Sequence, residues 1–320
     1  MKNVVVIGGG TGLSSLLKGL KDIKNINLSA IVTVADDGGS TGKIRKEFKI
    51  PAVGDLRQVI VSLSENESIL EKIMRYRFDN KDSQSLHGHS LGNLILTALI
   101  DIENDFYLGI EKIRDILNLK GEVYPIANDS EITLKANYTD KTSVIGESNI
   151  PNHNKKIESI EYVNHEKIKP NIMALRKIRE SDLIVLSMGS LYTSLIANLI
   201  IPGVKESIIE NSSAKIIYVS NIMTQRGETD GMTMYDHVKE IEKYIGYGKL
   251  DIVLVNNGKL NEEILKRYEE QNCFPIEIDS RIKNSHVELI AKNLLDSSVP
   301  YIRHDTKKIR KAFVNILNKI

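Results

Sequence analysis

Two glycine-rich stretches near the start of the chain have the residue types of loops that bind phosphate. Glycine permits positive φ angles and lets backbone N–H groups approach an anion, and the start of a helix carries a partial positive charge that stabilises one. An apolar run precedes each stretch. We therefore expect both loops to contact the phosphates of one nucleotide-type ligand. The expected contacts are Gly8, Gly9, Gly10, Thr11 and Gly12 in the first loop and Gly38, Gly39, Ser40 and Thr41 in the second.

The first loop departs from the dinucleotide-binding fingerprint Gly-x-Gly-x-x-Gly. Gly8 and Gly10 fit its first two positions, but Leu13 stands at the third and Gly12 comes one place early. Two glycine loops on adjacent strands favour a diphosphate or a sugar diphosphate instead. The structural alternative is a tight turn that binds nothing.

Asp36 and Asp37 stand between the second apolar run and the second glycine loop. In a dinucleotide site, an acid near this position holds the ribose hydroxyls. Paired carboxylates are also suited to Mg²⁺, either directly or through the phosphates of the ligand. The structural alternative is that one of the two aspartates caps the turn that follows.

Two polar sets follow in the helical part of the chain. Asp55 is placed to cap a helix and Arg57 lies in its first turn, where it either contacts a phosphate or is solvated. His89 and Asn93 flank the start of another predicted helix, and we expect them to hydrogen-bond the ligand. His87 and His89 lack a third ligand at convincing spacing, which argues against a zinc site.

Two later loops also follow predicted strands. Gly189 and Ser190 open a helix, as the first glycine loop does. Asn221, Thr224 and Gln225 carry amide and hydroxyl groups that suit a base or a sugar. No nucleophile with its base and orienting group emerges from these residues, so the sequence predicts a binding site and leaves catalysis open.

Alternating strands and helices must position these loops. Continuous β-branched runs predict buried parallel strands, and apolar residues at helical spacing predict the helices between them. The expected strands are 4–7, 28–34, 183–186, 215–219 and 252–255. The expected helices are 13–20, 56–63, 69–78, 91–102, 110–119, 172–179, 233–245 and most of 287–295 and 307–320.

The predicted fold class is α/β, a doubly wound Rossmann-like parallel sheet with a helical segment and a small antiparallel insertion. Short alternating segments place the insertion at about residues 121–165. We expect a single domain over residues 1–320, because no repeat or low-complexity linker divides the chain. Such sheets bind ligands at the carboxyl ends of their strands, where the polar loops described above would meet.

Composition narrows the class of protein further. The chain has 320 residues, 41% of them hydrophobic, and a formal net charge of +1, which provides no global field for nucleic acid. Cys273 is the single cysteine, which fits a reducing compartment. No apolar run approaches the roughly 20 residues that span a bilayer. We expect a cytoplasmic protein without a membrane span.

Taken together, these motifs resemble those of the YvcK family, the gluconeogenesis factors of Firmicutes. The family belongs to a superfamily with CofD, the 2-phospho-L-lactate transferase, which moves a phospholactyl group from a guanosine diphosphate carrier to a deazaflavin. The resemblance extends from Met1 to about residue 260. The stretches that carry it are Gly8–Ser14, Val34–Gly42, Gly54–Arg57, Gly88–Leu94, Gly189–Ser194, Asn221–Gln225 and Gly227–Gly231.

The resemblance implies binding of UDP-sugars, UDP-N-acetylglucosamine especially, and a role in cell shape and cell-wall precursor supply on gluconeogenic carbon. It also implies a protein partner in cell-wall synthesis, with the oligomeric state open. Three hypotheses follow: a UDP-sugar sensor without turnover, a CofD-like transferase using Asp36 or Asp37 with Mg²⁺, and an NAD(P)-dependent oxidoreductase. The offset third glycine counts against the last.

Overall fold

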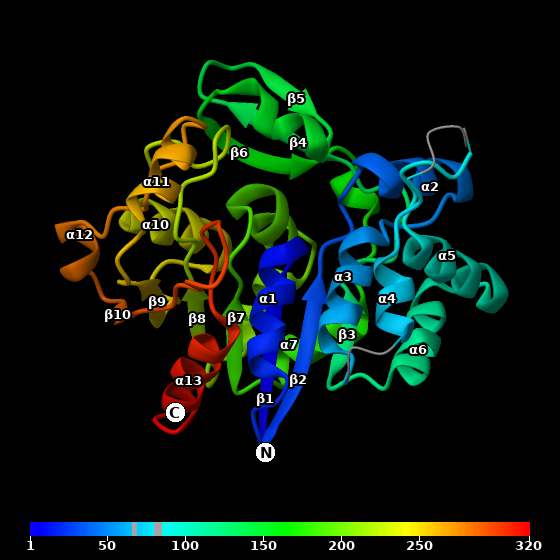
Figure 1. Ribbon diagram of the computed structural model, residues 1–320, viewed down its shortest axis with the longest axis horizontal. Coiled ribbons are helices and arrows are strands. Elements are labelled where there is room, and N and C mark those ends of the chain that lie inside the picture. The colour runs from blue at the N-terminus through cyan, green and yellow to red at the C-terminus, as the bar shows by residue number, and fades with distance from the viewer. Residues whose placement is uncertain (66–68, 80–84) are drawn as a thin grey trace.

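A seven-stranded parallel sheet forms the centre of the computed structural model (Figure 1), which describes residues 1–65, 69–79 and 85–320. The strand order is β10-β9-β8-β7-β1-β2-β3. The strands are β1 (Lys2–Gly8), β2 (Ile26–Val32), β3 (Glu122–Pro125), β7 (Leu183–Leu186), β8 (Lys215–Val219), β9 (Ile252–Asn256) and β10 (Glu288–Lys292).

The register of the strands brings their carboxyl ends together. Ile7 pairs with Ile31 of β2 on one side and with Leu186 of β7 on the other. The apolar run of β1 is buried throughout, as expected for a parallel strand covered on both faces. The loops after β1, β2, β7 and β8 therefore open at one edge of the sheet.

Helices cover both faces of the sheet. In Figure 1, α1 and α13 lie in front of the sheet and α7 lies behind it. The helices are α1 (Gly10–Leu20), α2 (Gly39–Phe48), α3 (Gly54–Leu63), α4 (Ile69–Arg75), α5 (Leu91–Glu103), α6 (Phe106–Leu117), α7 (Ile172–Arg179), α8 (Ala197–Leu199), α9 (Val204–Glu210), α10 (Met234–Ile245), α11 (Glu262–Glu269), α12 (Ser280–Lys283) and α13 (Thr306–Leu317). Shorter helical turns are η1 (Glu147–His153), η2 (His165–Lys167) and the π-helical η3 (Leu191–Ile196).

A three-stranded antiparallel sheet lies above the carboxyl edge of the main sheet (Figure 1). Its order is β5-β4-β6, from β4 (Leu134–Tyr138), β5 (Ser143–Ile145) and β6 (Ile157–Tyr162). Buried and partly exposed residues alternate along β4, as in a sheet with one covered face. We call these strands, together with η1, the antiparallel unit.

The α/β fold class is confirmed: a parallel sheet with helices on both faces and a small antiparallel sheet. Two details of the prediction are corrected. The region 287–295 contains strand β10 where a helix was expected, because edge pairing with β9 outweighs the helical pattern. Glu122–Pro125, at the start of the predicted insertion, pairs with β2 in the main sheet. Pro125 ends this short edge strand, a position where proline's missing N–H is tolerated.

Among the described helices, none has both the length and the apolar character that a membrane crossing requires.

Candidate functional site

The first glycine loop meets the loop after β7 at the carboxyl edge of the sheet. A Cβ added to Gly12 would lie 2.1 Å from the carbonyl oxygen of Met188, so only glycine fits there. The chain leaves β1 towards β2 and leaves β7 towards β8, on opposite sides. This divergence is the topological switch point at which open α/β sheets bind their ligands.

The N-cap residue of α1 provides no capping side chain. Gly9 is extended and gives α1 no side-chain cap, and Gly10 has φ +57°, which favours glycine. The N–H of Gly10 donates to the carboxylate of Asp55 at the start of α3. The residues of the first glycine loop thus lie at the N-terminus of a helix, as the sequence predicts. The carboxyl of Asp55 beside them was not predicted.

The paired aspartates after β2 accept backbone hydrogen bonds. Asp37 receives the N–H groups of Glu147 (3.0 Å) and Ser148 (2.9 Å) and so caps the start of η1 in the antiparallel unit. Asp36 Oδ1 receives the N–H of Gly38 at 2.9 Å. Asp37 therefore has a structural role, whereas Asp36 Oδ2 points towards Gly54, whose added Cβ would lie 2.8 Å away.

Three carboxyl groups from distant parts of the chain gather beside the glycine loops. Burial, and then the charge of Asp36, raise the pKa of Asp55 to about 7, against the hydrogen bond from Gly10. Burial and Asp36 likewise raise the pKa of Glu147 to about 8, against the hydroxyl of Thr193. At neutral pH this cluster therefore carries protons unless a cation neutralises it.

The cluster alone does not form a metal centre. No group of three or more histidine, cysteine, aspartate or glutamate side chains within residues 1–65, 69–79 and 85–320 has an arrangement that could hold a metal ion. Of the two aspartates predicted for Mg²⁺, Asp36 faces the glycine loops, and both oxygens of Asp37 are occupied by η1. Mg²⁺ would need further oxygen ligands from bound phosphates.

The predicted contacts on α2, α3 and α5 form a buried hydrogen-bonded chain. Ser40 Oγ lies 3.1 Å from His89 Nδ1 and accepts from Asn93 Nδ2 at 3.3 Å. Arg57 Nε donates to Asn93 Oδ1 at 2.8 Å, and its Nη1 to the carbonyl of Met74 at 3.2 Å. This chain positions the start of α2, and Thr41 is buried beside Gly54 in the same packing.

The polar residues after β7 and β8 likewise bond to one another. Asn221 accepts from the N–H of Gly189 (2.8 Å) and donates to the carbonyl of the same residue (2.5 Å). Both bonds hold the backbone of Gly189 in place. Thr224 is buried and accepts from the N–H of Phe274 at 2.9 Å. These two side chains therefore shape the site.

Glu228 is a buried acid that the sequence analysis missed. It accepts from the hydroxyl of Ser190, from the N–H of Tyr192 at 3.2 Å and from Nε2 of Gln225 at 3.0 Å. Burial raises the pKa of its carboxyl, against the hydrogen bonds from Ser190 and Tyr192. Ser190 and Gln225 are thus both engaged with Glu228, which anchors the start of η3.

A cleft of about 440 Å³ opens between the first turn of α1 and the loops after β7 and β8. Its far wall comes from the last third of the chain, from Tyr268 of α11 and the segment Tyr301–His304, for which the sequence predicted no element. The guanidinium of Arg303 lies over the ring of Tyr301, 4.5 Å from its centroid. Burial lowers the pKa of His304 to about 4, so its ring is neutral. No pattern in the sequence connects this wall to the glycine loops.

The fold and this cleft define a class: doubly wound α/β proteins whose candidate site lies at the switch point of the sheet. Residues 4–295 match the family described as 2-phospho-L-lactate transferase CofD. The chain belongs to the CofD family and, within it, to the gluconeogenesis factors.

Its relatives match over almost their whole length. The gluconeogenesis factor of Bacillus subtilis is 41% identical over 99% of this chain and 98% of its own. The putative gluconeogenesis factor of Thermotoga maritima is 44% identical and covered 98% in each direction. A crystal structure of a Bacillus halodurans protein has a TM-score of 0.92 at 42% identity, and covers 98% of this chain and 99% of its own.

Replacing Gly12 by alanine should destabilise the protein by about 1–3 kcal/mol, because the new Cβ would overlap the carbonyl of Met188. Gly39→Ala is the matched control, because a Cβ there meets nothing within 4 Å and only its φ of +44° is unfavourable. Urea denaturation of both variants measures the difference. A smaller loss for Gly12→Ala than for Gly39→Ala would contradict the close approach of the two loops.

Replacing Asp55 by asparagine should raise the melting temperature at pH 8. The folded-state pKa of Asp55 is about 7 against an ordinary 3.8, so the folded protein binds this proton more tightly and loses stability as the pH rises from about 4 to about 7. Asparagine keeps an acceptor for Gly10 and removes that loss. We expect a gain of at least about 2 °C at pH 8 and little change at pH 4.

Calorimetric scans from pH 4 to pH 8 test this expectation, with Asp101→Asn as the control at an exposed acid of α5. A gain for Asp55→Asn that is the same at every pH would refute the electrostatic explanation.

Proposed function

We propose that the chain binds a UDP-sugar, UDP-N-acetylglucosamine first among the candidates, and acts as a regulator without turnover. The observation that carries this proposal is the cleft of about 440 Å³ lined by Thr11 and Gly12 of the first turn of α1 together with Tyr268 and Arg303. Pockets for small ligands have volumes of this order. The N-terminus of α1 suits a diphosphate, the guanidinium of Arg303 adds positive charge, and the ring of Tyr268 suits a nucleotide base.

The three carboxyls limit how the ligand can lie. A diphosphate beside ionised Asp36, Asp55 and Glu147 would be repelled. Either Asp55 and Glu147 keep their protons, as their raised pKa values favour, or Mg²⁺ bridges Asp36 to the phosphates. Neutral carboxyls can also hydrogen-bond the hydroxyls of a sugar.

The regulatory part of the proposal rests on the resemblance to the YvcK family and on relatives called gluconeogenesis factors. Under this proposal the chain acts in the cytoplasm, with a role in cell shape and cell-wall precursor supply on gluconeogenic carbon. The partner would be a protein of cell-wall synthesis. An NAD(P) ligand would compete for the same cleft.

A CofD-like transferase is the second candidate, and the carboxyl cluster favours it. A carboxyl with a pKa near the working pH is suited to proton transfer during displacement from a diphosphate carrier. Asp55 and Glu147 meet that condition beside the loops where the diphosphate would lie. The family match to 2-phospho-L-lactate transferase adds support.

Arg303→Ala should weaken UDP and UDP-N-acetylglucosamine binding by about ten- to a hundredfold, the scale of one charged hydrogen bond. Arg267→Ala is the control, because this exposed arginine of α11 does not line the cleft. Titration calorimetry measures both affinities. Equal affinities for the two variants would move the ligand away from this wall of the cleft.

Turnover separates the two candidates. Purified protein should raise its melting temperature with UDP-N-acetylglucosamine and release no UDP over hours, with or without Mg²⁺. Steady release of UDP or UMP, or of GMP from a lactyl-diphosphoguanosine carrier given a deazaflavin acceptor, would replace the regulator by the transferase. Thermal shifts with GDP and NADP rank the alternatives.

A further inference from the structure

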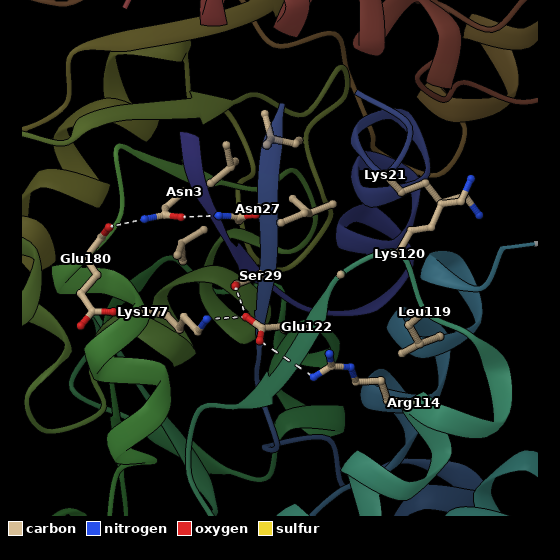
Figure 2. Close-up of a pocket in the computed structure, with 15 residues that line it drawn as sticks. Asn3, Lys21, Asn27, Ser29, Arg114, Leu119, Lys120, Glu122, Lys177 and Glu180 are labelled. Atoms are coloured by element: carbon tan, nitrogen blue, oxygen red, sulfur yellow. Dashed lines mark hydrogen bonds and ion pairs between the residues drawn. The ribbon is translucent and has the colours of Figure 1, made fainter. Parts of the chain in front are cut away.

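A second cleft, of about 550 Å³, lies at the opposite end of the central strands. The first half of β1 and the starts of β2 and β3 form its floor, and α7 and α6 flank it (Figure 2). Asn3 of β1 belongs to this cleft, whereas Gly8 at the other end of the same strand belongs to the glycine-loop site. Five steps along the strand lead from one to the other, roughly 17 Å at 3.3–3.4 Å per step.

Cations outnumber acids around this second cleft. Its lining includes four cationic side chains and two acidic ones, namely Lys21, Arg114, Lys120 and Lys177 against Glu122 and Glu180. Glu180 pairs with Arg176 outside the lining, and Lys120 pairs with Asp22 at 3.0 Å.

Glu122 neutralises the two cations that face each other across the cleft. Figure 2 shows Lys177 and Arg114 approaching its carboxylate from opposite sides. Ser29, buried in β2, donates its hydroxyl to the same carboxylate at 3.1 Å. Burial alone would raise the pKa of Glu122, but the hydrogen bond and charge of Lys177 bring it below its ordinary value. The carboxylate is therefore ionised, and one negative charge serves two cations.

Both cations keep donors for a further partner. Arg114 Nη1 lies 3.9 Å from Glu122, a charge contact too long to be a hydrogen bond, and the guanidinium has five N–H donors. Lys177 also lies 5.6 Å from the centroid of the Tyr124 ring, so one face of its ammonium packs on an aromatic surface. Their side chains are 45% and 28% exposed, which leaves them reachable from solvent.

We propose that this second cleft is a binding site for a small anionic metabolite, held by Lys177 and Arg114, with Glu122 occupying part of the anion's place in the free protein. The ligand class is a small phosphate or carboxylate anion, because arginine and lysine together bind both groups. A nucleotide-binding protein with such a site would respond to a second metabolite at a distance from its first.

The test measures anion affinity at this cleft alone. Inorganic phosphate and citrate are titrated separately into ¹⁵N-labelled protein, and the backbone amide signals of Ser29 and Lys177 report local binding, while those of Gly10 and Gly39 report the glycine loops. Phosphate and citrate distinguish the two chemical classes. Lys177→Gln combined with Arg114→Gln should weaken the local binding by at least about tenfold.

Replacing Glu122 by glutamine should strengthen anion binding. Glutamine keeps an acceptor for Ser29 and removes the competing charge, so the affinity for the anion should rise about two- to fivefold, the scale of one exposed charge pair. Arg179→Gln is the matched control, because Arg179 lies two residues from Lys177 on α7 and neither it nor its partner Glu210 lines the cleft. It should leave the affinity unchanged.

Saturable shifts at Ser29 and Lys177 with either anion, strengthened by Glu122→Gln and lost in the double variant, support the site. Shifts confined to Gly10 and Gly39, no saturable binding, or equal affinities in Glu122→Gln and Arg179→Gln would overturn it. None of these outcomes depends on whether the glycine-loop cleft binds a nucleotide sugar.

Discussion

The candidate site depends on the close approach of α1 to the loop after β7. Because a Cβ on Gly12 would lie 2.1 Å from the carbonyl of Met188, the two segments share one surface with no space for a side chain. Asn221, from the loop after β8, bonds both polar atoms of the Gly189 peptide and holds that surface from the other side. The loops after the neighbouring strands β1, β7 and β8 are thus held as one unit.

The second glycine loop is positioned differently, by contacts with the antiparallel unit. Asp37 caps η1 of this unit. Arg45 of α2 donates from Nε to the carbonyl of Ser130 at 2.9 Å and from its guanidinium to that of Ile132, in the segment that leads into β4. The same η1 carries Glu147 into the carboxyl cluster. A movement of the antiparallel unit would therefore change both the start of α2 and the acids beside the first loop.

The buried parts of the fold could be predicted from the sequence, and the edges could not. Strands β7 and β8 and helix α7 match their predicted bounds, since continuous apolar runs and helical spacing are local signals. Strands β3 and β10 lie at the two edges of the sheet, where pairing with one neighbour decides the conformation of a short segment.

The candidate site also has a part that the sequence could predict and a part that it could not. The loops after β1, β2, β7 and β8 could be assigned to one edge, because parallel strands share their carboxyl ends. Glu147, Glu228 and Arg303 could not, since an insertion, a loop and the last third of the chain bring them there. Nor could the sequence show that Thr224 and Asn221, which line the cleft, bond to backbone groups and support it.

The carboxyl cluster is costly to the folded protein, which is an argument for function. Two carboxyls whose pKa values are raised to about 7 and 8 favour unfolding whenever they ionise. Neutral residues of similar size would pack at Asp55 and Glu147 without that cost. Strongly shifted pKa values of this kind concentrate at functional sites, where a ligand, proton or cation makes use of the charge. The two carboxyls lie beside the N-terminus of α1, so acids and a candidate phosphate site share one edge of the sheet. An anion that binds there must either leave these carboxyls protonated or bring a cation with it.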